Sequence, residues 1–181
     1  MKKLLCLAFL VVSLTKGNAQ IYMAKDCEIS FFSPSPMEDI SAVNKTAKPI
    51  LNTATGDLQI RVSIQAFKFP DPLMQEHFNE NYLESDKYHN SEFKGKINEK
   101  VDYAVDGVNK VTVTGKMNMH GVDMDKTLEG TLTVKAGQIL LDTKFMVHLA
   151  DYKIVIPKLV VKNIAEDIEV KMKATLEPYK K

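Results

Sequence analysis

Apolar and polar residues alternate with a period of two through most of the chain after residue 20. The clearest segment places Leu58, Ile60 and Val62 on one side of Gln59 and Arg61. Because successive side chains of a strand point to opposite faces, this pattern predicts a strand with one buried face. Residues 111–119, 128–135, 139–149 and 168–176 repeat the pattern. Each of these segments is therefore expected to be a half-buried strand.

Shorter alternations at residues 27–31, 40–44 and 93–97 bring the expected number of strands to about eight. Ala136-Gly137 provides a turn between two of the longer segments, which predicts a hairpin there. Strands with one apolar and one polar face are typical of antiparallel sheet. A sandwich and a barrel both agree with the pattern, and the number of strands together with the inward aromatic residues favours a barrel. The expected fold class is all-β, with one or two short helices.

The alternation breaks once, just after Ala66. The large apolar residues change parity there, to Phe67 and Phe69, so that the inward face moves by one residue. An extra residue in one strand of an antiparallel pair produces such a shift. A β-bulge is therefore expected at this point.

A helix is predicted directly after the break. Asp71 is a favourable N-cap and Pro72 suits the first helical position. Met74, Phe78 and Tyr82 then recur at every fourth residue, which places them on one face of a helix. The segment should form a short amphipathic helix, the main helix of the domain.

The first nineteen residues have the pattern of a secretory signal peptide. Two lysines, Lys2 and Lys3, precede an apolar run at residues 4–14, and small residues at 17–19 precede Gln20. The run is shorter than the about 20 apolar residues that a transmembrane helix needs, and no later stretch approaches that length. We expect residues 1–19 to be cleaved, and residues 20–181 to form a single domain that is periplasmic or secreted.

Charge and cysteine content narrow the possible functions of the mature chain. Removal of residues 1–19 leaves 21 basic and 23 acidic residues, a net charge of −2 with histidine neutral. This balance gives no attraction for nucleic acid. Cys27 is then the one remaining cysteine, so no internal disulfide is possible. Since Cys27 alternates with Ile29 and Phe31, it is interpreted as a small core residue.

Arrangements that support catalysis or metal binding are missing from the sequence. The four histidines lack the spacing of zinc sites. Asp123 and Asp125 lack the remaining ligands of an EF-hand loop. Neither a nucleophile elbow nor a phosphate-binding loop occurs. No catalytic residue, metal or cofactor is predicted, and the chain is not expected to be an enzyme. His120 is interpreted either as a turn residue that bonds nearby backbone or as a residue that contacts a ligand.

The order of several short motifs resembles the bacterial YceI-like family. They lie at residues 29–33, 56–58, 67–69, 74–85, 93–95, 119–122, 145–149 and 151–154, and cover nearly the whole mature chain. One departure is His89 after Tyr88, where the family usually has proline. The resemblance implies a periplasmic protein with a lipocalin-like barrel that binds a polyisoprenoid lipid, with a helix near one side.

On this resemblance the expected function is non-enzymatic binding, storage or transport of an isoprenoid or other long-chain lipid in an apolar tunnel. The residues expected to contact the lipid are Phe67, Phe69, Met74, Phe78, Tyr82, Leu83, Phe93, Met117, Met119, Phe145 and Val147. Periodicity alone also allows these residues to be ordinary core. The alternative function is therefore a periplasmic protein-interaction module whose barrel is filled by its own side chains. Homodimers are common among soluble proteins, and the sequence selects no interface for one.

Overall fold

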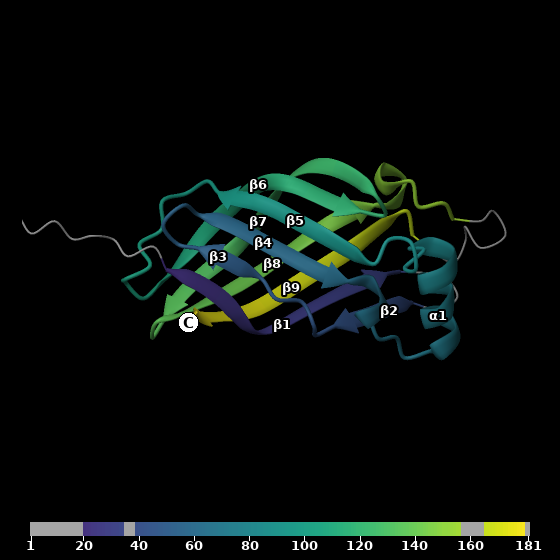
Figure 1. The fold of residues 1–181 in the computed structure, drawn as a ribbon, viewed down its shortest axis with the longest axis horizontal. Coiled ribbons are helices and arrows are strands. Elements are labelled where there is room, and N and C mark those ends of the chain that lie inside the picture. The colour runs from purple at the N-terminus through teal and green to yellow at the C-terminus, as the bar shows by residue number, and fades with distance from the viewer. Residues whose placement is uncertain (1–19, 35–38, 157–164, 180–181) are drawn as a thin grey trace, which may run out of the picture.

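The computed structural model describes residues 20–34, 39–156 and 165–179. Its strands form one antiparallel sheet in the order β2-β1-β3-β4-β5-β6-β7-β8-β9, and β1 also pairs with β9 (Figure 1). The strands are β1 (Ile21–Ser33), β2 (Ile40–Asn44), β3 (Ile50–Asn52), β4 (Asp57–Ser63), β5 (Asn90–Ile97), β6 (Gly107–Met119), β7 (Val122–Lys135), β8 (Gln138–His148) and β9 (Asp167–Pro178). Pairing of β1 with β9 closes eight of them into a barrel, which confirms the predicted fold class.

One strand of the barrel, β3, was not predicted. It contains only Ile50, Leu51 and Asn52, which is too short for a period of two to be recognised. It pairs with the first residues of β1, while β2 pairs with the last ones, at Ile29–Ser33. β2 and β3 therefore lie one after the other along the same edge of β1.

A buried amide joins the ends of β2 and β4. The side chain of Asn44 is fully buried, and its Nδ2 donates to the carbonyl oxygen of Ser63 at 2.8 Å. Its Oδ1 accepts from the backbone nitrogen of Thr46 at 2.8 Å and from the Thr46 hydroxyl at 3.0 Å. A buried polar group is costly unless it is hydrogen-bonded, and here both ends of the Asn44 amide have partners. The bond to Ser63 links the end of β2 to the end of β4, two strands that do not pair with each other.

The predicted β-bulge after Ala66 is wrong. β4 ends at Ser63 and is followed by a single 3-10 turn, η1 (Ile64–Ala66), after which Lys68 forms an isolated antiparallel bridge with Val43 of β2. Phe67 then donates its N–H to the carbonyl of Ile64 at 3.2 Å. The change of parity therefore comes from a helical turn at the end of a strand. A bulge does occur in β1, where the register with β9 shifts between Ala24 and Asp26.

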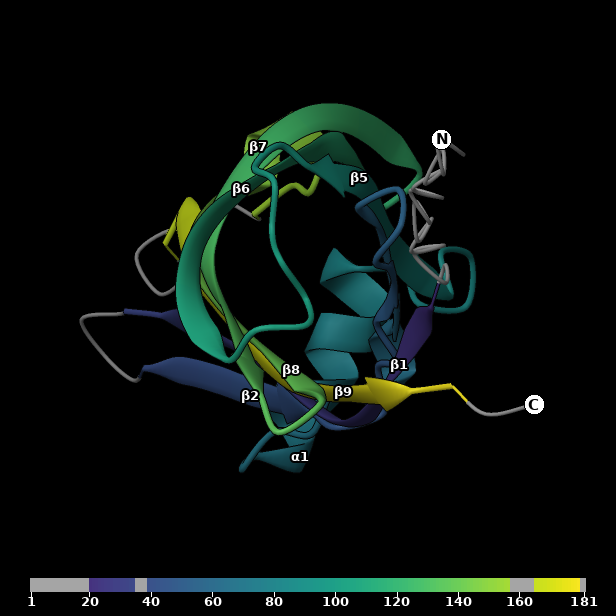
Figure 2. The same cartoon turned by 90° about the vertical axis from the view of Figure 1, so that its left-hand side faces the viewer.

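The predicted helix is present and covers one end of the barrel. Helix α1 (Pro72–His77) continues directly into a π turn, η2 (Phe78–Tyr82). As expected, Asp71 is the N-cap, and its Oδ1 accepts from the backbone nitrogen of Leu73 at 2.7 Å. Figure 2, viewed from the opposite end, shows the helix lying across the far end of the barrel. No helix among the described residues is long and apolar enough to cross a membrane.

The opposite end of the barrel is covered by the connection between β5 and β6. Val101 and Tyr103 of this connection pack against the hydrophobic core. Burial raises the pKa of the Tyr103 hydroxyl above its ordinary value. The two ends therefore differ: a loop packs directly onto the core at one end, and a helix lies over the barrel at the other.

Candidate binding cavity

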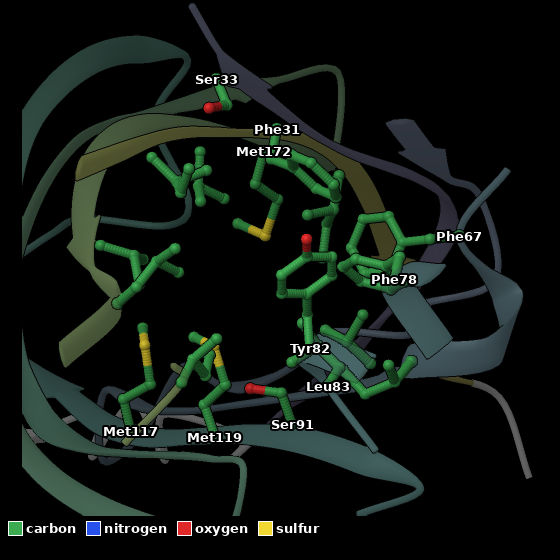
Figure 3. Close-up of a pocket in the computed structure, with 18 of the residues that line it drawn as sticks. Phe31, Ser33, Phe67, Phe78, Tyr82, Leu83, Ser91, Met117, Met119 and Met172 are labelled. Atoms are coloured by element: carbon green, nitrogen blue, oxygen red, sulfur yellow. The ribbon is translucent and has the colours of Figure 1, made fainter. Parts of the chain in front are cut away.

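The barrel contains a cavity of about 410 Å³ at the end that the helix covers (Figure 3). This volume lies within the range of about 300–1,000 Å³ that is usual for small-molecule sites. Strands β1, β2, β4, β5, β6, β7, β8 and β9, the helix and the segment after β8 all contribute to its wall. Most of the lining side chains are apolar; the others are Ser33, His77, Tyr82, Ser91, Glu92 and Thr143.

All eleven residues that were predicted to contact a lipid line this cavity. They are Phe67, Phe69, Met74, Phe78, Tyr82, Leu83, Phe93, Met117, Met119, Phe145 and Val147. The structure thus brings them around one space, while their role in binding stays a prediction. Further lining residues come from strand faces that were predicted to point inward but not selected: Ile29, Phe31, Ile60, Val62, Ile168, Val170 and Met172. Alternation alone would have identified them, because they share the inward parity of their strands.

Four phenylalanines pack together where the helical segment meets the barrel wall. Phe31 of β1 stacks on Phe78 of η2 with ring centroids 5.5 Å apart. Phe67 and Phe69, from the segment after η1, lie 5.7 and 5.0 Å from Phe78. Aromatic pairs at such separations add a favourable contribution beyond the area they bury. The cluster therefore forms an apolar part of the cavity wall where the helical segment meets β1.

Polar atoms in the cavity wall are few, and most already have partners. The Ser91 hydroxyl donates to the carbonyl of Asn118 at 2.7 Å, and the Thr143 hydroxyl donates to the carbonyl of Glu129 at 2.5 Å. The hydroxyl of Tyr82 points into the cavity, as Figure 3 shows, and has no hydrogen-bond partner among the described residues. Burial raises the pKa of Tyr82.

Charge is nearly absent from the same wall. Neither lysine nor arginine occurs among the described residues that line it. The carboxylate of Glu92 is paired with Lys94 at 2.9 Å and with Arg61 at 3.4 Å, both of them exposed side chains. A long uncharged hydrocarbon fits such a wall, because burying apolar surface is favourable and no buried charge is left unpaired.

A group of residues able to hold a metal does not occur among the described residues. His77 lines the cavity, whereas His89, His120 and His148 do not. His148 lies on the outer face, as predicted, and its Nδ1 contacts Asp167 at 2.9 Å, which raises its pKa. His89 contacts the carbonyl oxygen of Ser85 through its Nδ1 at 2.8 Å, and this hydrogen bond links the two ends of the turn between them.

Cys27 is expected to be unreactive in the folded protein. Its side chain is buried in the core, as predicted, and burial raises the pKa of its thiol to about 12, with Asp26 and Glu28 adding to the effect. Because the thiolate is the reactive form, almost none is present at pH 8. An aromatic disulfide reagent should therefore label Cys27 only after denaturation by guanidinium. Rapid labelling of the folded protein at pH 8 would contradict this placement.

Comparison with known proteins places this fold among characterised ones. The family described as the YceI-like domain matches residues 27–176. A polyisoprenoid binding domain from Saccharophagus degradans, implicated in plant cell wall breakdown, is similar with a TM-score of 0.74 and 15% identity, over 89% of this chain and 99% of that one. No curated protein sequence matches the chain.

Two further solved structures share the fold. BcnA of Burkholderia cenocepacia has a TM-score of 0.70 and 15% identity, over 82% of this chain and 95% of that one. The YCEI protein of Campylobacter jejuni has a TM-score of 0.59 and 16% identity over the whole of both chains. At these identities the likeness to the solved structures shows the fold.

Proposed function

The chain belongs to the YceI-like family, and we propose that it binds an isoprenoid or other long-chain lipid inside its barrel. In this proposal it stores or carries the lipid in the bacterial envelope and catalyses no reaction. The observation that supports it most directly is the cavity of about 410 Å³, whose wall is apolar and uncharged over nearly all its surface. The polyisoprenoid binding domain of similar fold adds support for the ligand class.

The energetics of such binding are favourable without any specific polar contact. Burial of one CH₂ group contributes about 0.8 kcal/mol, so the five carbons of an isoprene unit contribute about 3 to 4 kcal/mol. Association of a ligand costs about 4 to 15 kcal/mol. A chain of a few isoprene units therefore offsets this cost, and the length of the cavity would set the preferred chain.

The rival proposal is a protein-interaction module with a barrel filled by its own side chains. It requires the inward residues to pack against one another, as in an ordinary core at high density. The cavity favours lipid binding over this alternative, because a space of this size remains between the inward side chains. A homodimer, and export by cleavage of residues 1–19, which lie outside the described residues, stay predictions.

Native mass spectrometry of the mature protein, purified from a bacterial envelope, tests the proposal. The expected result is a discrete added mass that extracts into organic solvent as a prenyl or other long-chain lipid. A bare protein mass that persists after incubation with prenyl lipids would contradict lipid binding. Co-purification of one stoichiometric protein partner together with that bare mass would support the interaction module.

A further inference from the structure

Two cavities adjoin inside the barrel. Besides the cavity of about 410 Å³, there is a smaller one of about 40 Å³. Leu58 of β4 and Val113 of β6 line only the smaller cavity, which lies farther from the helix. Five residues line both cavities, and we call them the floor of the larger one: Ile60, Phe93, Leu128, Thr143 and Met172.

The ring of Phe93 owes its position to a glycine. Phe93 of β5 pairs with Ile60 of β4, and the next inward position of β5, farther from the helix, is Gly95. A Cβ atom on Gly95 would lie 2.8 Å from both Cε1 and Cζ of Phe93. The ring therefore occupies the space that a side chain at position 95 would take, and only glycine leaves this space open.

Beyond the smaller cavity the barrel is filled by its own side chains. Val101 and Tyr103 of the connection between β5 and β6 pack against the core at that end. Four inward side chains are completely buried there: Leu51, Leu132, Ile139 and Leu176. The described residues therefore leave a lipid chain no room beyond the smaller cavity, and its tail has to end near the floor.

Phe93 is the floor residue least able to make room for a chain. Met172 is unbranched and turns about three bonds, so it can adapt to the shape of a ligand. Phe93 has a planar ring with two rotatable bonds, is only 4% exposed, and lies against the backbone of Gly95. In a close-packed interior such a ring is held in place, and it separates the two cavities.

We propose that Phe93 sets the length of the longest prenyl chain that the cavity accepts, and that Gly95 positions its ring. This inference rests on the proposed lipid-binding function and specifies the ligand: an uncharged prenyl chain whose tail ends against Phe93 and whose head lies toward the helix. Removal of the ring joins the two cavities. Since the ring has six carbons and an isoprene unit has five, Phe93→Ala should accept about one further unit.

The partition of prenyl alcohols between the lipid-free protein and phosphatidylcholine vesicles measures this limit. A unit that moves from the bilayer into the barrel exchanges one apolar environment for another, so partition should change little while the chain still fits. The first unit that does not fit lies in water, and exposure of its five carbons should lower partition to the protein at least about tenfold. Alcohols that differ by one isoprene unit should therefore show a sharp drop at one chain length.

In Phe93→Ala this drop should occur at a chain about one isoprene unit longer than in the native protein. Phe93→Leu removes less of the core, and should reduce the size of the drop at the native limit. Thermal unfolding establishes that each variant is folded. A drop that stays at the native length and size in both folded variants would show that Phe93 does not set the limit.

Phe145→Ala is the matched control, because Phe145 lines the larger cavity but not the smaller one. It removes a ring of the same size from the side of the cavity. Partition of every alcohol should fall, whereas the chain length at the drop should stay that of the native protein. The same lengthening in Phe145→Ala as in Phe93→Ala would mean that total volume sets the limit, and would overturn the role of Phe93.

The role of Gly95 is tested by a change in the opposite direction. In Gly95→Ala the new methyl group displaces the Phe93 ring toward the helix, so the drop should occur at a shorter chain. The double variant Phe93→Ala/Gly95→Ala has the same methyl group, 3.0 Å from the carbonyl oxygen of Thr114, but no ring to displace. It should behave as Phe93→Ala does. A shorter limit in the double variant would mean that Gly95 acts through the strands rather than through Phe93.

The outcomes separate this inference from the proposed function. Uptake of prenyl alcohols with no drop at any length, or with a drop that the Phe93 variants do not change, would overturn the role of Phe93 and leave lipid binding standing. If the native protein took up no prenyl alcohol of any length, the proposed function and the role of Phe93 would both fail.

Discussion

Replacing Phe145 with aspartate should strongly weaken lipid binding, whereas replacing its neighbour Met146 with aspartate should leave binding unchanged. The two residues are adjacent on β8 and point to opposite faces of the barrel wall. Phe145 lines the cavity, while the side chain of Met146 is 52% exposed on the outer surface. A carboxylate at position 145 would lie in an apolar wall without a cation to pair with it, which is strongly unfavourable.

The affinity of Phe145→Asp for the lipid should be lower by at least about 100-fold. This factor corresponds to about 2.8 kcal/mol of binding free energy, because each factor of ten corresponds to about 1.4 kcal/mol. Native mass spectrometry gives the fraction of each variant that carries lipid, and titration with a fluorescent prenyl lipid gives its affinity. Circular dichroism and thermal unfolding establish that both variants are folded. Equal lipid content in folded Phe145→Asp and Met146→Asp would show that the cavity is not the binding site.

The strands were predictable because one face of each is buried and the other is not. In β6, for example, Val111, Val113 and Met117 are buried, while Lys110, Thr114 and Lys116 are not. The prediction of a bulge after Ala66 was wrong because the apolar pattern does not identify the cause of a change of parity. The pattern shows only that the inward face moves by one residue, and a 3-10 turn at the end of a strand produces this shift as a bulge does. Only the hydrogen-bond partners distinguish the two.

The lining of the cavity was predictable, but the cavity itself was not. Phe67, Met119 and Val147 belong to inward faces whichever way the barrel is filled. Whether inward side chains meet or leave space depends on the barrel diameter and on the residues opposite, and both follow from register. The contacts of His120 could not be predicted either. Its ring contacts the carboxylate of Glu84 and the carbonyl oxygen of Tyr152, which lie 36 and 32 residues away in the chain.

Register also explains two glycines whose position in the strands gave no hint of their role. Gly95 of β5 and Gly115 of β6 both have inward parity, and the register pairs them directly. A Cβ atom on Gly115 would overlap the carbonyl oxygen of Lys94 and the Cα of Gly95. Both of these are backbone atoms of the neighbouring strand, which cannot move aside as the end of a side chain could. The strands approach closely here only because neither residue has a side chain.

Gly115→Ala should therefore destabilise the protein by about 3 kcal/mol or more, at the upper end of what overpacking costs. Gly107→Ala, at the start of the same strand, is the matched control, because a Cβ there meets no atom within 4 Å and its φ is not positive. Its effect should be neutral or stabilising by up to about 1 kcal/mol, through a smaller entropy of the unfolded chain. Urea unfolding followed by circular dichroism gives both free energies of unfolding. Similar stability of the two variants would mean that β5 and β6 do not approach each other at Gly95 and Gly115 as the structure has them.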